Sequence, residues 1–577
     1  MTDAAALPWE RPLGAEPLPD GACRFRVWAP AARGVEVDVG GERTALEPRL
    51  GGVFEGVARA RHGDDYGYAL DGGDPLPDPC SRFQPAGVRG PSRVVDPARF
   101  PFAAEGWRGL SPDGLLVYEL HVGTFTEEGT FAAAARRMAE LRALGVTAIE
   151  LMPVATFPGD RNWGYDGLYT WAPHPAYGGP EGLAALVDAA HADGLGVILD
   201  VVYNHVGPGA EALEAFGPYF TDRYGTPWGR AMNFDDADCG GAREWAIQNA
   251  CMWLRDYRID GLRVDAVQAI YDMSARHVLA ELCERARAAA PWTPVLIAES
   301  DLNDPRVVRP AERGGWGFDA QWYDDFHHAL HAALSGERDG YYADFGRLAD
   351  LAGATARPYV YDGRWSAYRR RRHGAPAPDV PPAALVAYSQ NHDQVGNRAT
   401  GDRPAPETLA LRALWTLMAP FTPMLFMGEE DGSRQPFQFF TDHIDPEIAE
   451  ATREGRRREF AAFAGFSAED VPDPQDPATF ARSRPGAGAA DPGRRRLHEE
   501  LIALRARAPE GPAEVRFDEE EGWMVMTRGD LRVWGNFGER PARVPGAGRE
   551  VLLATHPEAR LEEGALSLPP LAGAVTR

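Results

Sequence analysis

The chain has 577 residues, of which 44% are hydrophobic and 25% are charged, and its formal net charge is -25. A chain of this length is too long for one hydrophobic core, so we expect several domains in a soluble globular protein. The negative charge argues against nucleic acid or an anionic membrane as a partner, and no apolar stretch is long enough to cross a bilayer.

The N-terminus and the cysteines indicate where the protein works. Residues 1–16 lack the basic start and the apolar run of a signal peptide. The five cysteines are widely spaced and include no Cys-x-x-Cys pair, which argues against a zinc site or a disulfide framework. We therefore expect a cytoplasmic protein with reduced thiols.

The sequence pattern of residues 1–100 predicts an N-terminal β-sandwich and a linker. Segments 23–28, 35–39, 54–58 and 66–70 alternate apolar with polar residues, and Gly, Pro and Ala residues lie between them. A small module of this kind is most often an immunoglobulin-like sandwich, and such modules include carbohydrate-binding domains.

Residues 101–510 alternate between strand and helix patterns. Most of the strands are near-continuous apolar runs, which is typical of buried parallel strands. The predicted strands begin at Leu115, Val146, Val197, Ile259, Val295, Asp319, Leu385 and Met424. The predicted helices cover 130–144, 181–193, 243–257, 275–289, 409–417 and 497–505. Eight such units predict a (β/α)8 TIM barrel, with loop excursions at about 206–241 and 330–384.

Alternation of apolar and polar residues returns near the C-terminus. It covers 515–517, 523–526 and 531–537. This pattern predicts a small C-terminal β-sandwich over residues 511–577, so that the fold class is a multidomain protein with a central barrel between two β-sandwiches.

Charged side chains follow several of the predicted barrel strands. The third strand is followed by Asp200–His205, the fourth by Asp265, the fifth by Glu299, the sixth by 324–328 and the seventh by 390–394. The active site of a TIM barrel lies at these carboxyl ends. A purely structural explanation is poor, because crowding like charges at one rim costs free energy.

Arg263 and Asp265 lie two residues apart, so a strand places both side chains on one face. The guanidinium keeps the neighbouring carboxylate ionised, which suits a nucleophile. Taken alone, the pair is better explained as a structural ion pair. The acids at the other strand ends favour the catalytic interpretation.

The four stretches Asp200–His205, Gly261–Asp265, Glu299 and Asn391–Asp393 resemble, in this order, the signature regions of the α-amylase superfamily of glycoside hydrolases. The resemblance implies a retaining mechanism with two carboxyl groups about 5–5.5 Å apart. Asp265 would be the nucleophile and Glu299 the general acid and base. Asp393 would stabilise the oxocarbenium-like transition state.

The same resemblance implies contacts with the sugar. Arg263 would orient Asp265, while His205 and His392 would donate hydrogen bonds to the hydroxyls beside the scissile bond. Tyr165 would stack on the sugar ring, although a core aromatic residue is an equally weighted interpretation. Gln268 stands where digestive amylases commonly have Lys, which implies different contacts beyond the cleavage point.

Three further stretches resemble the maltooligosyltrehalose trehalohydrolase family within this superfamily, namely 299–308, 324–331 and 388–398. Enzymes of that family release trehalose, in trehalose biosynthesis, by hydrolysing the α-1,4 bond next to the terminal trehalose unit of their substrate. The substrate-binding residues that the resemblance implies are Tyr165, His205, Arg263, Val264, Ala266, Val267, Gln268, Asp324, Asp325, Phe326, His327, His328, His392, Gln394, Val395, Gly396 and Asn397.

The expected partner is the oligosaccharide substrate maltooligosyltrehalose. A pathway partner, maltooligosyltrehalose synthase, is implied without physical contact. The hydrolytic mechanism needs no cofactor and no metal. Asn204 matches a calcium-binding residue of many amylases, but the remaining oxygen ligands cannot be located in the sequence.

Alternative functions remain open at this stage. A 1,4-α-glucan branching enzyme shares the barrel and the three carboxylates, and a debranching enzyme is a weaker third choice. A non-catalytic glycan-binding protein is the alternative from another class. The three trehalohydrolase-like stretches favour the hydrolase, and the presence of all three carboxylates argues against a binding protein.

Overall fold

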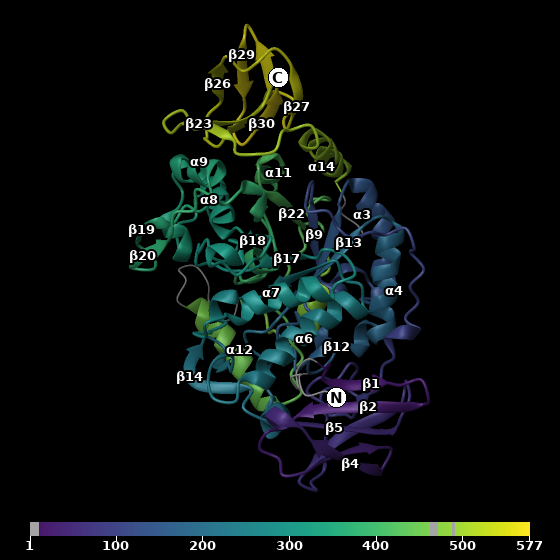
Figure 1. Ribbon diagram of the computed structural model, residues 1–577. Helices are drawn as coiled ribbons and strands as arrows, with labels where there is room; N and C mark the ends of the chain where they lie inside the picture. The colour runs from purple at the N-terminus through teal and green to yellow at the C-terminus, as the bar shows by residue number, and fades with distance from the viewer. Residues whose placement is uncertain (1–10, 462–470, 487–490) are drawn as a thin grey trace.

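The computed structural model describes residues 11–461, 471–486 and 491–577. Its three parts follow one another along the molecule (Figure 1). The N-terminal sheets lie at one end, the barrel in the middle and the C-terminal sheets at the other end.

The N-terminal part is a single folded antiparallel sheet. Its strands are β1 (Gly14–Pro17), β2 (Ala22–Trp28), β3 (Val35–Val39), β4 (Glu42–Pro48), β5 (Val53–Arg59), β6 (Asp65–Leu70), β7 (Pro75–Leu76) and β8 (Ser92–Arg93). In the sheet, β5, β4 and β3 separate β2 from β6. Nevertheless the rings of Phe25 in β2 and Tyr66 in β6 are only 5.1 Å apart. The sheet therefore folds over on itself, and the prediction of an N-terminal β-sandwich is confirmed.

The central part is a closed barrel of eight parallel strands. Around the barrel they are β9 (Val117–Leu120), β10 (Ala148–Leu151), β13 (Gly196–Val201), β16 (Gly261–Val264), β17 (Val295–Ala298), β18 (Ala320–Trp322), β21 (Leu385–Tyr388) and β22 (Thr422–Phe426), and β22 pairs with β9. The TIM barrel is confirmed, and each of its strands lies at or within a few residues of its predicted position.

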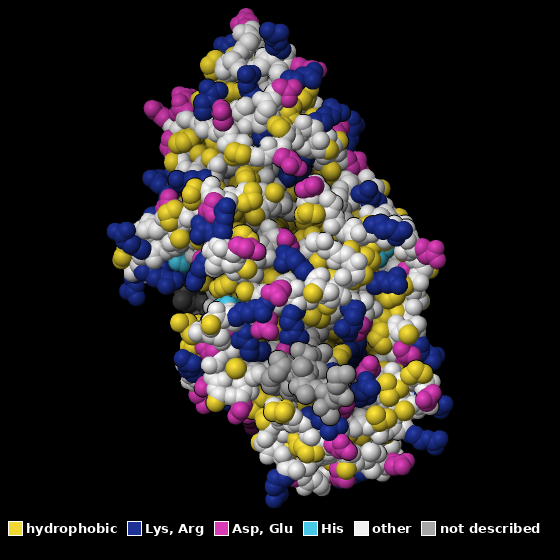
Figure 2. Space-filling model, viewed as in Figure 1, with side chains coloured by type: hydrophobic (Ala, Val, Ile, Leu, Met, Phe, Trp, Pro, Cys, Tyr) yellow, Lys and Arg dark blue, Asp and Glu magenta, His cyan; other side chains and the backbone are white. Residues whose placement is uncertain are grey.

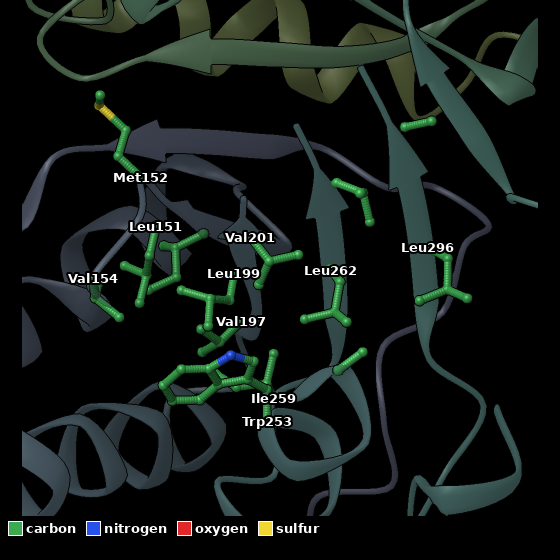
Figure 3. Close-up of a cluster of buried hydrophobic side chains, with 14 of the residues drawn as sticks. Leu151, Met152, Val154, Val197, Leu199, Val201, Trp253, Ile259, Leu262 and Leu296 are labelled. Atoms are coloured by element: carbon green, nitrogen blue, oxygen red, sulfur yellow. The ribbon is translucent and has the colours of Figure 1, made fainter. Parts of the chain in front are cut away.

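Alternate residues of each strand face the inside and the outside of the barrel. Ile198 points inward and belongs to a small internal apolar cluster. Its neighbours Val197 and Leu199 point outward and pack near Trp253 of helix α6 (Gly240–Asp256) (Figure 3). These strands are apolar on both faces, so they read as continuous apolar runs in the sequence.

The helices surround the barrel (Figure 1). Those outside the long loops are α1 (Val122–Phe125), α2 (Phe131–Ala135), α3 (Met138–Leu144), α4 (Gly179–Ala192), α6, α7 (Val278–Ala289), α8 (Asp324–Ser335), α10 (His392–Gly396), α11 (Leu409–Met418), α12 (Pro446–Ala461), α13 (Pro477–Arg482) and α14 (Pro492–Arg505). The single helix expected over 130–144 is divided into α2 and α3. The Arg137 amide donates to the Ala134 carbonyl at 2.9 Å, which tightens the chain into a turn between them.

Two long loops leave the barrel and contain regular structure of their own. After β13 the chain forms α5 (Glu211–Phe216) and the hairpin β14 (Phe220–Thr226) and β15 (Gly229–Met232). After α8 it forms α9 (Leu348–Ala356) and the hairpin β19 (Asp362–Ser366) and β20 (Arg371–Gly374). A third, short hairpin, β11 (Ala155–Thr156) and β12 (Tyr169–Pro173), follows β10.

The C-terminal part has two packed sheets. One contains β23 (Glu514–Asp518), β24 (Trp523–Arg528), β25 (Leu531–Asn536), β30 (Gly573–Thr576) and β27 (Val551–Ala554), and the other β26 (Ala542–Pro545), β29 (Ala565–Leu568) and β28 (Arg560–Glu562). Val525 and Trp534 of the first sheet share an apolar core with Val544 and Leu566 of the second. The predicted C-terminal β-sandwich is confirmed.

The surface is mixed in charge. Figure 2 shows Arg and acidic side chains interspersed over the visible face. In the described ranges, no helix combines the length and the apolar character needed to cross a membrane.

Candidate active site

The inside of the barrel becomes charged toward the carboxyl ends of its strands. Along β9, β10 and β13, an apolar inward-facing residue is followed two positions later by an acid, namely Glu119, Glu150 and Asp200. Arg263 of β16 lies beside Asp200 in the strand register. All four side chains are buried. A charged layer therefore supports the residues at the strand ends.

Arg263 is the centre of this layer. Its Nη1 donates to the two carboxylate oxygens of Asp200 at 2.9 and 2.8 Å, and to Asp265 Oδ1 at 2.7 Å. Its Nη2 lies 3.8 Å from Glu299 Oε2, and its guanidinium carbon lies 4.1 Å from the centre of the Trp322 ring. One fully buried cation thus lies within 4 Å of three carboxyl groups. The structure brings together Arg263, Asp265 and Glu299, as the strand positions led us to expect.

Glu299 follows β17 and is held by the chain after β16. Its Oε2 accepts a 2.6 Å hydrogen bond from the Ala266 amide. Ala266 has a φ of 40°, a left-handed conformation at the point where the chain leaves the strand. Burial raises the pKa of Glu299 well above its usual range; the Asp265 carboxylate adds to this rise, whereas Arg263 opposes it. A carboxyl group that keeps its proton suits a general acid.

A chain of hydrogen bonds connects Glu119 to Asp200 through His392 and Tyr165. His392 Nδ1 and the His392 amide both contact the Glu119 carboxylate. His392 Nε2 lies 2.8 Å from Tyr165 Oη, which donates to Asp200 Oδ2 at 2.6 Å. Because the tyrosine hydroxyl gives its proton to Asp200, His392 donates from both ring nitrogens, and this requires the imidazolium form.

The charge of His392 follows from its neighbours. Burial by itself lowers the pKa of His392, but the carboxylates of Asp393 and Glu119 outweigh burial and raise it to about 9. The Asp393 Oδ1 atom is 3.5 Å from His392 Nε2. The His392 side chain is only 1% exposed and both nitrogens are occupied. In this structure His392 therefore contacts Glu119, Asp393 and Tyr165. Its expected hydrogen bond to a sugar hydroxyl stays a prediction.

Asp393 lies in the first turn of the short helix α10. Asn391 caps this helix and accepts a 2.7 Å hydrogen bond from the Gln394 amide. Asn397, one turn later, donates to Asp393 Oδ1 at 2.9 Å. The Asp393 side chain is 38% exposed, so it is accessible from the mouth of the barrel.

Asp324 begins α8 at the end of β18 and faces α10. It accepts hydrogen bonds from the Tyr388 hydroxyl and, at 3.2 Å, from Gln394 Nε2. Burial raises the pKa of Asp324 to about 7. Asp324 and Gln394 therefore form one polar wall beside the carboxylates.

The rest of the run 324–328, namely residues 325–328, is buried, and of these four residues His327 lines a cavity next to α10. Asp325 is buried and accepts from the Asn303 amide group and from two backbone amides of the following loop. Phe326 is fully buried in the main core, while the buried His327 and His328 pack among aromatic rings. The physical reason is the helix: successive residues of α8 point in different directions, so only one of its faces reaches the site.

Other residues of the expected subsites also have backbone or core positions. Three apolar side chains are almost completely buried in the main core, namely Val264, Val267 and Val395. Gly396 has no space for a side chain, because a Cβ atom there would lie 2.2 Å from the Trp163 ring. Gln268 is half-buried, and its Oε1 has no hydrogen-bond partner in the described part of the chain.

His205 contacts the backbone of Tyr165. Its Nε2 contacts the Tyr165 carbonyl at 2.9 Å, and its ring stacks on Trp228 at 4.9 Å between centroids. Trp228 lies in the turn of the β14–β15 hairpin and is 51% exposed. Its indole is an open apolar surface beside the site.

The sequence interpretation missed Glu119 and Glu150. Burial raises the pKa of Glu150 well above its usual range, with a further contribution from Glu119. Neither carboxyl oxygen of Glu150 has a hydrogen-bond partner among the residues described, and burial favours the protonated form of this acid at the floor of the site. A single Glu in an otherwise apolar buried strand (Val117–Leu120, Ala148–Leu151) was the signal that could have found both.

Within residues 11–461, 471–486 and 491–577, no group of three or more His, Cys, Asp or Glu side chains is arranged to hold a metal ion. The Asn204 side chain is buried, and its two polar atoms have no hydrogen-bond partner in these ranges.

Comparisons with known proteins agree with this geometry. Residues 104–217 match the family model described as alpha amylase, catalytic domain, and residues 510–575 match a domain of unknown function, DUF3459. A malto-oligosyltrehalose trehalohydrolase of a Rhizobium species is 47% identical over 96% of this chain and 98% of its own length. The chain belongs to the malto-oligosyltrehalose trehalohydrolase family.

Other relatives place this trehalohydrolase family member in its wider context. A malto-oligosyltrehalose trehalohydrolase of Arthrobacter ramosus is 48% identical over 92% of this chain and 95% of its own. The crystal structure of a putative alpha amylase from Salmonella typhimurium superposes with a TM-score of 0.89 at 36% identity, over 98% of this chain and 99% of that one. A 1,4-alpha-glucan branching enzyme of Salinibacter ruber is 32% identical, but over only 54% of this chain and 58% of its own.

Proposed function

We propose that this protein is a retaining glycoside hydrolase that cleaves the α-1,4 bond next to the terminal trehalose unit of maltooligosyltrehalose. Membership of the trehalohydrolase family supports the substrate. The observation that supports the chemistry is Arg263, whose guanidinium lies within 4 Å of Asp200, Asp265 and Glu299 at the mouth of the barrel.

In the first step, a carboxylate oxygen of Asp265 attacks the anomeric carbon on the chain side of the bond. The bond to the O4 atom of the trehalose unit breaks, and Glu299 transfers its proton to that oxygen. Arg263 holds Asp265 through a 2.7 Å hydrogen bond that leaves the second carboxylate oxygen for the sugar. Trehalose leaves, and a glycosyl-enzyme ester remains.

In the second step, Glu299 acts as a base. It takes a proton from water, the water oxygen attacks the anomeric carbon, and the ester bond to Asp265 breaks. The contact between Glu299 and the Ala266 amide stabilises the carboxylate form in this half of the cycle. Two inversions at one carbon give a product with the α configuration.

Asp393 stabilises the positive charge that develops on the sugar ring. The adjacent His392 imidazolium lies 3.5 Å from Asp393 Oδ1 and fixes the direction of this carboxylate. Glu119 in turn holds His392 from the inside of the barrel. The transition-state charge is therefore met by a carboxylate that is positioned before the substrate arrives.

We also propose a cytoplasmic location, without nucleic acid as a partner. All five cysteines are free thiols, and the net charge of -25 opposes binding to polyanions. Maltooligosyltrehalose synthase would supply the substrate as a pathway partner. The sequence does not imply a physical contact between the two proteins. The domain limits at residues 100 and 510 are likewise proposals.

Product analysis tests the function. The protein is incubated separately with maltooligosyltrehalose and with amylose, and products are separated by chromatography. We expect free trehalose from the first substrate and little change in the second. New α-1,6 linkages in amylose without trehalose release would instead identify a branching enzyme, and binding without turnover would identify a glycan-binding protein.

A further inference from the structure

A second cavity, of about 390 Å³, lies next to α10. It is lined by residues of α8, α10 and α11, by the segment 402–408, and by Leu571 of the C-terminal domain. It shares His327, Gln394 and Val395 with the expected subsites, but Asp265, Glu299 and Asp393 do not line it. It is therefore separate from the catalytic carboxyl groups.

Arg412 of α11 is a buried cation in the wall of this cavity. It is 1% exposed, and its Nε donates to the Thr408 hydroxyl at 3.0 Å. Its Nη2 donates to His331 Nδ1 at 3.4 Å, and burial lowers the pKa of His331 to about 4, so this imidazole is neutral. Its Nη1 has no hydrogen-bond partner in the described part of the chain.

Arg403 brings a second guanidinium to the same cavity. It donates to the carbonyls of Gln435 at 2.8 Å and Met427 at 2.9 Å, and to the Gln390 side-chain oxygen at 3.2 Å. All of these acceptors are neutral. In the described ranges, neither Arg403 nor Arg412 forms an ion pair with a carboxylate. Arg403 is partly exposed, whereas Arg412 is buried, and a buried cation without a counter-charge is unfavourable.

The acids near the cavity do not supply that counter-charge. Glu337 and Asp402 are both paired with Arg398, and Glu407 is exposed to solvent. Glu429 is buried near both guanidinium groups, but burial raises its pKa to about 8 and keeps it mainly neutral at pH 7. Glu430 is a second buried acid near Arg403, and it accepts a hydrogen bond from the Tyr118 hydroxyl. In the described part of the chain, neither guanidinium therefore has a carboxylate at ion-pair distance.

We propose that this cavity binds a small inorganic oxyanion of the phosphate or sulfate class between Arg412 and Arg403. The planar fork of a guanidinium fits an oxyanion through two parallel hydrogen bonds. The Ser389 hydroxyl, which is completely buried, lines the cavity and has no partner among the described residues, is a further donor.

The bound anion would act on the catalytic helix. Arg403 holds Gln390, and the next residue, Asn391, is the cap of α10, which carries Asp393. An anion that fixes Arg403 therefore fixes the start of this helix. This inference does not depend on the identity of the sugar substrate.

Thermal unfolding and calorimetric titration of the full-length protein test the proposal. Inorganic phosphate and sulfate are titrated at constant ionic strength against sodium chloride. We expect a saturable rise in melting temperature of roughly 2 °C with either oxyanion. Arg412→Met should weaken binding at least about tenfold, because a charge-assisted hydrogen bond is lost. The exposed Arg434→Met is the matched control and should bind like the unmodified protein.

A crystallographic soak with selenate gives an independent readout if Arg412→Met does not fold. An anomalous peak between Arg412 and Arg403 supports the proposal. Water alone in the cavity, a selenate ion elsewhere only, or an identical melting response in phosphate and chloride would overturn it.

Discussion

The substitution Glu119→Gln tests most directly whether the charged layer keeps His392 protonated. The substitution keeps the shape of the side chain and removes its charge. It removes the charge of Glu119, which raises the pKa of His392, and it leaves one acceptor oxygen for the two N–H groups of His392 that contact Glu119. Both side chains are 1% exposed, so solvent does not screen the loss. Burial and the charge of Arg263, which both lower this pKa, are then opposed by the charge of Asp393.

The size of the effect follows from the pKa. With a pKa of about 9, roughly nine-tenths of His392 is charged at pH 8. If the pKa returns to its ordinary value of about 6.5, only about 3% is charged at that pH. We therefore expect Glu119→Gln to lower kcat/KM at pH 8 about 30-fold, and at pH 5.5 much less. The pH profile of trehalose release measures this directly.

Glu150→Gln is the matched control. Glu150 lies directly opposite Glu119 in the strand register and is equally buried, but neither of its carboxyl oxygens has a hydrogen-bond partner among the described residues, so it does not hold His392. Its substitution should leave the dependence of kcat/KM on pH at alkaline pH unchanged. An equal loss of kcat/KM at pH 5.5 and pH 8 in Glu119→Gln would refute the electrostatic reasoning and leave Glu119 a purely structural role. A changed pH dependence of kcat/KM at alkaline pH in Glu150→Gln would refute it as well.

Three other predictions concern the acid, the packing and the stability. Glu299→Gln should reduce turnover about 10²- to 10⁴-fold while calorimetry shows unchanged substrate binding; retained activity would show that another residue is the acid. Gly396→Ala places a Cβ 2.2 Å from Trp163 and should destabilise the fold by about 1–3 kcal/mol, and an unchanged unfolding midpoint would contradict this contact. Glu429 has a folded pKa of about 8, above its unfolded value, so its contribution to stability is complete below about pH 4.5 and is lost as pH rises through 8. Glu429→Gln should therefore lose less stability than the unmodified protein between pH 5.5 and 9, as thermal melts at both pH values would show, and parallel losses would argue against this buried acid.

Most of the barrel could be predicted because its strands are buried on both faces. The run from Val197 to Val202 is apolar except at Asp200, and the single acid marks the strand end. The strand β4 (Glu42–Pro48) was not predicted. Only Leu46 of this strand is buried, so its sequence lacks the apolar alternation that identifies a half-buried strand.

The site was predicted in part. Asp265, Glu299 and Asp393 are single residues at strand ends, so their positions follow from the fold. The run 324–328 was treated as a unit, but the helix turns Phe326 and Asp325 into the interior. Which face of a helix meets a cleft depends on the packing of other segments, and a short motif does not contain this information.

The role of Glu119 could not be predicted from the sequence. Its partner His392 is 273 positions away, and the two meet only because β9 and β21 both end at the same mouth. A strand pattern identifies Glu119 as an unusual residue in an apolar run. The closed barrel is needed to show that it holds a histidine beside Asp393.

Time-resolved proton NMR of maltooligosyltrehalose hydrolysis tests the central proposal most directly, because one spectrum reports both the bond cleaved and the configuration of the new reducing end. We predict that free trehalose appears together with a maltooligosaccharide whose reducing end is first the α anomer, before mutarotation. Release of glucose or maltose without trehalose would contradict the proposed bond specificity. A β anomer in the first spectra would contradict the assignment of Asp265 as nucleophile.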